Sequence, residues 1–500
     1  MSAHFPPRGE LNFAAELLGK LGVRIGGLAL DSRKAGAGDL FLAFPGEQAD
    51  GRSYIPQAIA NGATAVLWES RGFEWSREWR VPNLGVPGLR DRLGAIADEF
   101  HGHPSRDLWM TGVTGTNGKT SCSHWIAQCL SHLGRKSAVI GTIGSGFPGA
   151  LQVAANTTPD AVALHGQLAA LVARGARACA MEVSSHGIEQ GRVNGVEFDV
   201  ALFTNLSRDH LDYHKTMEDY AAAKAKLFRW PHLKHAVVNM DDSFGRELAG
   251  SIDRARTKVL GYGLGYGAIG GEIAGRKLEL STRGLTLEIE TPWGAAQLKS
   301  PMLGRFNASN LLGVLGVLMS SDIPLQDAVE ALEHVQPVPG RMQMVREADA
   351  PLVVVDYAHT PDALEKVLET LRGLLSPGGR LLCVFGCGGD RDPGKRPLMG
   401  EVATRFSDHA WVTSDNPRSE DPQAIIRDII AGAHPNYSTE PDRSAAIANA
   451  VYEAQPEDVI LLAGKGHETY QEIGGFKLPF DDVEVARELL RRLPGRVTHA

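Results

Sequence analysis

The sequence has 500 residues, of which 43% are hydrophobic and 22% are charged, and its formal net charge is −8. This length exceeds one ordinary hydrophobic core, so we expect several domains. The acidic balance argues against a nucleic-acid partner, since such proteins carry a basic face. Five scattered cysteines indicate reduced thiols in a cytoplasmic protein. No signal-peptide pattern opens the chain, and no apolar run approaches the roughly 20 residues that span a bilayer, so we expect no membrane insertion.

Pattern breaks divide the chain into three α/β regions, at 1–104, 105–336 and 337–500. In the first region, a helical segment is predicted at 55–61 and strands are predicted at 27–31, 39–44 and 63–68. The segment HGHP at 101–104 is typical of a linker. We therefore expect a small N-terminal α/β domain.

The second region alternates strands with helices. Strands are predicted at 108–113, 178–183 and 200–205, and a helix is predicted to begin near Thr120. This alternation predicts a mainly parallel sheet with helices on both faces. The prolines and glycine of VQPVPG at 335–340 suit an interdomain hinge.

The third region repeats the same pattern, which predicts a Rossmann-like α/β domain. Strands are predicted at 352–355, 380–385, 409–412 and 459–463, and helices at 362–374, 423–431 and 483–492. In such sheets, ligands bind beyond the carboxyl ends of the strands. The polar clusters of this region follow its predicted strands, so we expect a binding site there.

A glycine-rich turn, GVTGTNGKTS at 112–121, lies between a predicted strand and a predicted helix. Lys119 can reach the β- and γ-phosphates of a nucleotide, and the Thr120 hydroxyl can bind Mg²⁺. The strict phosphate-loop pattern has glycine where this chain has Val113, so the loop is a variant, and a turn that merely caps a helix is the alternative. We predict that the loop binds ATP through Gly115, Thr116, Asn117, Gly118, Lys119, Thr120 and Ser121.

The loop GTNGKTS resembles the ATP loop of the Mur ligase superfamily, which also includes folylpolyglutamate synthases and cyanophycin synthetases. The segments SRDHLDYH and YAAAK at 207–224 and DNPR at 415–418 add to the resemblance, which extends from Leu30 to Glu468. It implies three domains: a small N-terminal α/β domain that binds the uridine nucleotide, a central ATP-binding domain with a phosphate loop, and a C-terminal amino-acid-binding domain. It also implies an ATP-dependent amide-bond ligase that requires Mg²⁺.

The resemblance implies further roles in the central region. Glu182 and His210 match magnesium ligands of the family, and Thr120 with Glu182 is also a chemically sensible set of oxygen donors. Lys224 matches a carbamylated lysine, which would bind metal as a carbamate; a solvated helix face is the alternative. Lys119, Lys224, His210 and Glu182 are thus the implied catalytic residues.

Three further sets of residues are implied by the resemblance. The UDP-muramyl-dipeptide would contact Leu30, Ser32, Glu47, Gln48, Ala49, Asn156, Thr157, Thr158, Ser184, Gln190 and Arg192. Asn310, Arg341 and Asp356 would complete the ATP site. The amino acid would contact Arg391, Asp415, Asn416, Pro417, Arg418, Gly464 and Glu468. Arginines suit the distal carboxylate of diaminopimelate, and the acids suit its ammonium.

The resemblance implies that the chain adds meso-diaminopimelate to UDP-N-acetylmuramoyl-L-Ala-D-Glu through an acyl phosphate, in peptidoglycan precursor synthesis. Family members that add diaminopimelate carry DNPR, whereas lysine-adding relatives lack its arginine. A lysine-adding or folylpolyglutamate-type ligase is the alternative within the same enzyme class. An alternative from a different class is a switch that hydrolyses ATP without ligation. We expect a cytoplasmic monomer whose partners are its small-molecule substrates.

Overall fold

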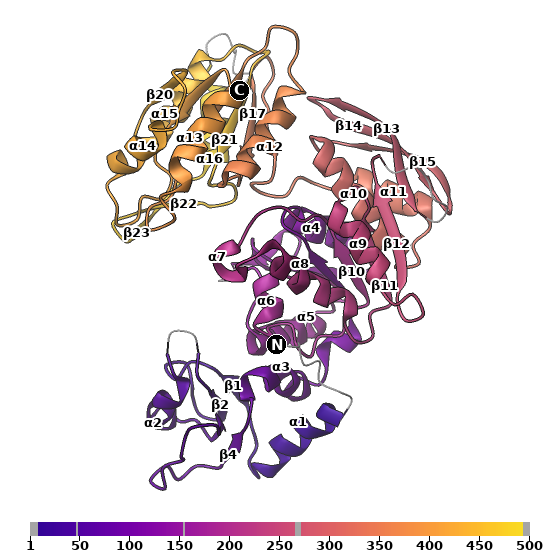
Figure 1. Ribbon diagram of the computed structural model, residues 1–500, viewed down its shortest axis with the longest axis vertical. Coiled ribbons are helices and arrows are strands. Elements are labelled where there is room, and N and C mark those ends of the chain that lie inside the picture. Colours follow the sequence, from indigo (N-terminus) through magenta and orange to yellow (C-terminus); the bar gives the residue numbers. More distant parts are fainter. Residues whose placement is uncertain (1–8, 47–48, 154–155, 266–271, 494–500) are drawn as a thin grey trace, which may run out of the picture. The chain divides into compact units, whose positions relative to one another are not determined.

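The computed structural model describes residues 9–46, 49–153, 156–265 and 272–493 (Figure 1). The chain folds into two compact units. The first comprises Met1–Ala274, Glu290–Gly294 and Asn310–Leu332, and the second comprises Gly275–Ile289, Ala295–Ser309 and Glu333–Ala500. The predicted division near residues 104 and 336 stays a prediction. None of the helices in these ranges is both long and apolar enough to cross a bilayer.

The first sheet has four parallel strands in the order β1-β2-β3-β4. Its alternating side chains explain its two layers: Leu40 and Leu42 pack with α1 and α3, whereas Phe41 and Ala43 pack with α2. The predicted strands and the helix at 55–61 are confirmed, while α1, β4 and α3 were not predicted. The bounds are α1 (Gly9–Lys20), β1 (Gly27–Ala29), β2 (Asp39–Ala43), η1 (Gly51–Tyr54), α2 (Ile55–Ala60), β3 (Ala65–Glu69), β4 (Asn83–Val86) and α3 (Leu89–Phe100).

The second sheet has eleven strands in the order β15-β14-β13-β12-β11-β10-β5-β9-β6-β7-β8. Its central strands β5, β9, β10, β11 and β12 are parallel, as predicted. Its first elements are η2 (Pro104–Asp107), β5 (Trp109–Thr114), α4 (Lys119–His132), β6 (Ser137–Ile140), β7 (Ser145–Phe147), β8 (Ala150–Gln152), α5 (Ala161–Ala173), β9 (Ala178–Glu182), α6 (Ser185–Glu189) and β10 (Val200–Phe203). The later ones are α7 (Leu211–His214), α8 (Met217–Ala225), η3 (Lys226–Arg229), β11 (His235–Asn239), α9 (Ser243–Ser251), β12 (Lys258–Gly263), β13 (Ile273–Ser281), β14 (Gly284–Thr291), β15 (Gly294–Ser300), α10 (Arg305–Met319) and α11 (Leu325–Glu333).

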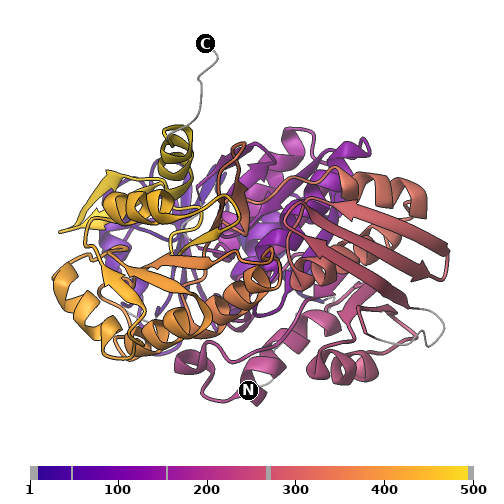
Figure 2. The same ribbon diagram turned by 90° about the horizontal axis from the view of Figure 1, so that it is seen from above.

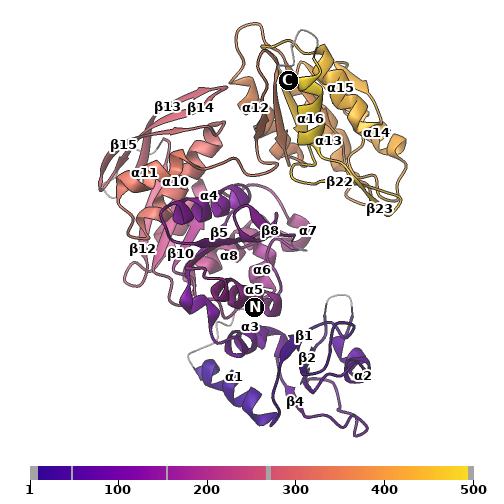
Figure 3. The same ribbon diagram turned by 180° about the vertical axis from the view of Figure 1, so that it is seen from behind.

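Helices cover both faces of the central strands (Figure 3). Ala201 and Phe203 of β10 share one buried cluster with α5 and α9. Leu202, which points to the other face, approaches α10 at Gly313. Because both faces are buried, the central strands read as nearly continuous apolar runs.

The third sheet has six strands in the order β16-β17-β21-β18-β19-β20 and lies between two helix layers (Figure 2). Alternate strand residues pack on α12, α13 and α14 on one face, and on α15 and α16 on the other. The predicted strands and helices of this region are confirmed. The bounds are β16 (Gln343–Val345), β17 (Leu352–Asp356), α12 (Pro361–Arg372), β18 (Leu381–Phe385), α13 (Lys395–Phe406), β19 (His409–Val412), α14 (Pro422–Ile430), β20 (Tyr437–Thr439), α15 (Arg443–Glu453), β21 (Val459–Ala463), β22 (Tyr470–Ile473), β23 (Phe476–Pro479) and α16 (Asp482–Arg491).

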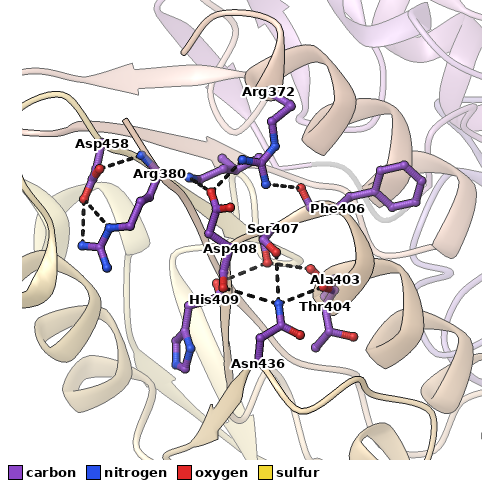
Figure 4. A network of polar contacts seen from close by, with 11 residues as sticks. Arg372, Arg380, Ala403, Thr404, Phe406, Ser407, Asp408, His409, Asn436 and Asp458 are labelled. Atoms are coloured by element: carbon purple, nitrogen blue, oxygen red, sulfur yellow. Dashed lines mark hydrogen bonds and ion pairs between the residues drawn. The ribbon is translucent and has the colours of Figure 1, made fainter. Parts of the chain in front are cut away.

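A polar network ties the amino ends of β18, β19 and β21 together (Figure 4). Asp408 accepts hydrogen bonds from Leu381 N and from the Arg372 guanidinium, both at 2.6 Å. Asp458 accepts from Arg380 N at 2.7 Å and from its guanidinium at 2.9 Å. This network fixes the amino edge of the sheet. The predicted site residues lie at the opposite, carboxyl edge.

Candidate active site

The loop at residues 115–118 joins β5 to α4 at the carboxyl edge of the central sheet. Gly118, with φ +86°, caps the N-terminus of α4, where backbone N–H groups lack helical partners and favour anions. A Cβ at Gly115 would lie 1.9 Å from Thr204 Oγ1, and one at Gly118 would lie 2.5 Å from Asn310 Oδ1. The strand–loop–helix arrangement predicted for the ATP phosphates is therefore present, and its glycines are required by space.

Hydrogen bonds from the segment after β10 hold this loop. Thr116 N donates to Asn205 O at 2.8 Å, and Asn117 N donates to Asn205 Oδ1 at 3.0 Å. Lys119 lies back across the loop, with Nζ 2.9 Å from Gly115 O and 2.8 Å from Thr116 O. The N–H groups of Thr116 and Asn117 thus stabilise the loop conformation.

Glu182 ends β9 beside the loop and is fully buried. Its Oε2 accepts from Thr120 Oγ1 at 3.1 Å and from Thr142 Oγ1 at 3.1 Å, and its Oε1 accepts from Thr142 N at 2.8 Å. The structure therefore brings the predicted metal ligands Thr120 and Glu182 together as adjacent oxygen donors. Mg²⁺ prefers such donors.

Lys224, on α8, is 1% exposed, and its Nζ donates to Gly115 O at 2.9 Å. The amine also lies 4.3 Å from the centre of the Tyr220 ring. Burial lowers the pKa of Lys224 well below its usual value, and the nearby Lys119 lowers it further. Lys224 is thus a buried amine with a strong tendency to be neutral, beside the phosphate loop.

His210 lies at the start of α7 in the left-handed region, at φ +54°. Its ring packs edge-on against His186 at 4.8 Å and against Tyr220 at 5.8 Å between ring centroids. Burial lowers its pKa, and Asp209 opposes this effect. His210 and Lys224 therefore both contact Tyr220, whereas Thr120 and Glu182 form a separate pair across the loop.

Most of the residues predicted to bind the muramyl substrate in the central region lie together. Thr158 Oγ1 donates to Glu182 O at 2.9 Å and lies 3.1 Å from Ser184 Oγ. Arg192 donates from one guanidinium nitrogen to Thr158 O and from Nε to Gln190 Oε1, both at 2.8 Å. Thr157 reaches the cluster through Thr142, with 3.0 Å between the hydroxyls, while Asn156 is exposed. The cluster adjoins Glu182, so the residues predicted to bind the muramyl substrate and those predicted to bind metal share one edge of the sheet.

The predicted uridine residues lie in the first sheet. Ser32 is buried and donates to Gln57 Oε1 at 2.8 Å, and Leu30 is half-buried. Ala49 O accepts from Gly46 N at 2.8 Å. Glu47 and Gln48 lie outside the described residues.

The remaining predicted ATP contacts are divided between the units. Asn310, on α10, is buried and lies against Gly118 in the first unit. In the second unit, Asp356 accepts from Met342 N and Ala358 N, both at 2.8 Å, and the guanidinium carbon of Arg341 lies 4.9 Å from the Tyr357 ring centre. Burial raises the pKa of Asp356, and Arg341 opposes this effect.

The predicted amino-acid residues of the second unit form one polar cluster at the carboxyl ends of β19 and β21. Asn416 Nδ2 donates to Glu468 Oε2 at 2.7 Å, and Asn416 Oδ1 accepts from Glu472 N at 2.9 Å. Burial raises the pKa of Asp415, which lies one residue before Asn416. Gly464 opens the segment after β21 with φ +109°, and Pro417 is buried. Two acids and an amide are thus held at one site.

Arg418 lies beside this cluster with φ +52°. One of its guanidinium nitrogens donates to Gly389 O at 2.7 Å, and its Nε lies 3.3 Å from Glu472 Oε2. A Cβ at Gly388 would lie 2.9 Å from Arg418 and 3.7 Å from Arg391 Cγ. The two predicted carboxylate binders therefore flank the same loop.

Three family profiles match the chain. They are described as "Mur ligase family, catalytic domain" at residues 24–101, "Mur ligase middle domain" at 113–318 and "Mur ligase, glutamate ligase domain" at 340–466. A UDP-N-acetylmuramoyl-L-alanyl-D-glutamate--2,6-diaminopimelate ligase of Chromobacterium violaceum is 55% identical over 95% of this chain and 96% of its own length. The chain belongs to the Mur ligase family.

A solved structure of 39% identity agrees with this assignment, and a second structure shares the fold. A structure of UDP-N-acetylmuramoyl-L-alanyl-D-glutamate--2,6-diaminopimelate ligase has a TM-score of 0.69 and 39% identity, over 93% of this chain and 94% of that chain. A folylpolyglutamate synthase of Mycobacterium tuberculosis, complexed with ADP, has a TM-score of 0.60 over 75% of this chain and 91% of its own, at 19% identity. The second likeness shows the shared fold alone.

Two further residues of this Mur ligase lie at these sites and carry no sequence motif that predicted them. Thr142 makes two of the hydrogen bonds that hold Glu182, but it follows β6 without any motif that marks it. Lys465 is fully buried and lies 3.4 Å from Glu468 Oε2. Lys465 stands between two glycines directly after a predicted strand, and this position could have marked it as a site residue.

The thiols of this Mur ligase are all free and buried. Burial raises the pKa of Cys179, Cys383 and Cys387 to about 12. Within the ranges that the structure describes, three or more His, Cys, Asp or Glu side chains nowhere gather into a metal-binding group. The oxygen pair of Thr120 and Glu182 lies beside the phosphate loop, with 3.1 Å between the two atoms.

Proposed function

We propose that this Mur ligase joins meso-diaminopimelate to UDP-N-acetylmuramoyl-L-alanyl-D-glutamate, with ATP activating the carboxylate as an acyl phosphate, in peptidoglycan precursor synthesis. The observation that carries the proposal is the Thr120–Glu182 pair at 3.1 Å beside a glycine loop and Lys119, in a chain 55% identical to a ligase of that name. The reaction needs no nucleophilic side chain, because positioning and charge stabilisation can supply most of the catalysis.

In this proposal, Lys119 and the start of α4 hold the nucleotide phosphates while the substrate carboxylate attacks the γ-phosphorus in line. Mg²⁺ fits the oxygen donors of Thr120 and Glu182, and when bound it would neutralise phosphate charge. Thr158, Ser184 and Arg192 would hold the muramyl peptide beside Glu182. The amine of diaminopimelate then attacks the acyl carbon, and phosphate leaves.

Lys224 is proposed to carry a carbamate. A neutral amine nitrogen can attack CO₂ and lose a proton, which leaves an anionic carbamate able to bind metal; a protonated amine has no lone pair for this step. The buried position of Lys224 and its lowered pKa support the modification. His210 would complete the metal set.

For the amino acid, Asp415 and Glu468 would bind the distal ammonium, and Arg418 with Arg391 would bind the distal carboxylate. A lysine substrate would offer these arginines no distal carboxylate, which disfavours lysine. We further propose that the enzyme is a cytoplasmic monomer, since its five thiols are free and its substrates are small molecules.

The test measures ADP release with the UDP-muramyl-dipeptide plus either diaminopimelate or lysine. Arg418→Ala should raise the KM for diaminopimelate about 100-fold, because it removes a charged partner of the substrate carboxylate. Arg418→Lys should recover only part of the activity, because lysine lacks the planar fork. Arg427→Ala removes an exposed arginine of α14 and should change nothing.

Hydroxylamine added without diaminopimelate should trap the activated carboxylate as a hydroxamate. Wild-type enzyme that consumed no ATP with diaminopimelate, or used lysine equally well, would contradict the proposal.

A further inference from the structure

Lys465 is a buried cation inside the amino-acid cluster. It follows β21 in the segment Gly464–Glu468, and its side chain is 0% exposed. The end of β21 is itself fixed, because Arg443 donates to Ala463 O at 3.0 Å and pairs with Asp482 at 2.7 Å. The backbone that carries Lys465 is therefore anchored at the end of β21.

The ammonium of Lys465 faces three oxygen atoms of the cluster. Its Nζ lies 3.2 Å from Asn416 Oδ1, 3.4 Å from Glu468 Oε2 and 3.7 Å from Asp415 Oδ1. The ammonium donates to Asn416 and Glu468, whereas its 3.7 Å approach to Asp415 is an ion pair beyond hydrogen-bond distance. Lys465 therefore contacts the cluster rather than solvent.

The position of Lys465 also fixes the Asn416 amide. Asn416 Oδ1 must accept, since it faces Lys465 Nζ and Glu472 N, and its Nδ2 is therefore the atom that donates to Glu468. Lys465 thus holds Glu468 both directly and through Asn416.

The positive charge of Lys465 also balances the negative charges of the cluster. Asp415 and Glu468 are two mostly buried carboxylates that both lie against Lys465. Two buried like charges without a counter-charge are unfavourable, and one of them would take up a proton. With both acids ionised and Lys465 protonated, the three side chains carry a net charge of −1, which matches one ammonium group.

We propose that Lys465 is a positioning residue that sets the net charge of the amino-acid site, so that this site accepts an amino acid through a single distal ammonium. The inference rests on the proposed function of the second unit. It assigns Lys465 no contact with the reacting atoms, and it places the effect of Lys465 on amino-acid binding rather than on ATP.

The first test compares Lys465→Met with the wild type in ADP release. The KM for diaminopimelate should rise at least about tenfold, because Asn416 and Glu468 lose the buried ammonium that positions them, while the KM values for ATP and the UDP-muramyl-dipeptide stay within about twofold. Lys477→Met is the matched control, since Lys477 is exposed on β23 against Tyr470. An unchanged KM for diaminopimelate in a folded Lys465→Met enzyme would overturn the inference.

A charge-restoring double variant separates charge from structure. Asp415→Asn alone leaves Glu468 balanced by Lys465, a net charge of zero, and should bind diaminopimelate poorly. Asp415→Asn with Lys465→Met returns the cluster to −1 and should bind it several-fold more tightly than Asp415→Asn alone. A double variant no better than Asp415→Asn would refute the charge role, even if Lys465→Met does not fold. Wild-type enzyme that ignores diaminopimelate would instead refute the proposed function.

Discussion

At the scale of single residues, His467 is a half-buried histidine whose Nδ1 atom is shielded from solvent. Its ring centroid lies 5.2 Å from that of Tyr357, and its Nδ1 has no hydrogen-bond partner among the described residues. Burial lowers the pKa of His467 from 6.5 to about 4, and Arg341 adds to the effect. The folded chain therefore keeps His467 neutral at a pH where the unfolded chain protonates it.

This lowered pKa predicts a stability loss in mild acid. Between about pH 6.5 and 4, only the unfolded state takes up the His467 proton, so unfolding becomes easier as the pH falls. A drop of this size corresponds to about 3 kcal/mol. Urea unfolding of the wild type and His467→Gln at pH 7.5, 6 and 4.5 should show the wild type losing stability faster with acid. Parallel losses in both proteins would show that His467 does not carry this effect.

At the scale of elements, a comparison of two glycines distinguishes the effect of backbone strain from the effect of steric crowding. Gly118 in the phosphate loop has φ +86°, and Gly149 in the turn between β7 and β8 has φ +83°. A Cβ at Gly118 would lie 2.5 Å from Asn310 Oδ1, whereas one at Gly149 would meet nothing within 4 Å. Both alanine variants incur about 1 kcal/mol of backbone strain, but only Gly118→Ala also pushes the loop away from α10.

We therefore expect Gly118→Ala to weaken ATP binding at least about tenfold, through distortion of a preorganised site, while Gly149→Ala binds ATP normally. Fluorescence titration with a labelled ATP analogue measures both affinities. Equal ATP affinity in the two variants would mean that the Asn310 side chain moves aside easily and that the loop tolerates a Cβ.

The phosphate loop was also the element that the sequence predicted best. Its glycines, Lys119 and the flanking apolar runs are local signals, and local signals suffice where one turn makes the site. Thr142 could not be found, because its contact with Glu182 joins segments 40 residues apart, and only the pairing of β6 with β9 brings them together. Lys465 stands between two glycines after a predicted strand, but its burial depends on contacts with Asn416 and Glu468 that the fold alone brings together.

At the scale of the whole molecule, residues 101–104 were predicted to be a linker, and the structure gives them fixed partners. His103 Nδ1 lies 2.7 Å from Asp98 Oδ2, and Pro104 begins η2. Asp98 also lies 3.4 Å from Nδ1 of the fully buried His165 on α5, whose Nε2 contacts Asn194 O at 2.9 Å. Composition indicated a break here because glycine and proline mark turns, but it gave no sign that distant residues would fix the turn.

Asp98 is consequently expected to connect α3 to the residues that we propose bind the muramyl substrate. Burial raises the pKa of Asp98, but hydrogen bonds from His165 and His103 overcome this and hold it below 3.8. Its carboxylate thus stabilises the fold above about pH 4, and this contribution is lost as the pH falls through the lowered pKa. Asp98→Asn should cost about 2 kcal/mol at pH 7, as expected when a charged hydrogen-bond acceptor is lost.

The same variant should affect one substrate more than the others. His165 holds Asn194 O, and the turn that contains Asn194 follows Gln190 and Arg192, so a loosened His165 should raise the KM for the UDP-muramyl-dipeptide and spare ATP. Asp91→Asn, on the exposed side of α3, is the control. Thermal unfolding gives the stability loss and ADP release gives the KM values. If Asp98→Asn melts like Asp91→Asn, or raises both KM values equally, the Asp98–His165 contact does not couple α3 to this site.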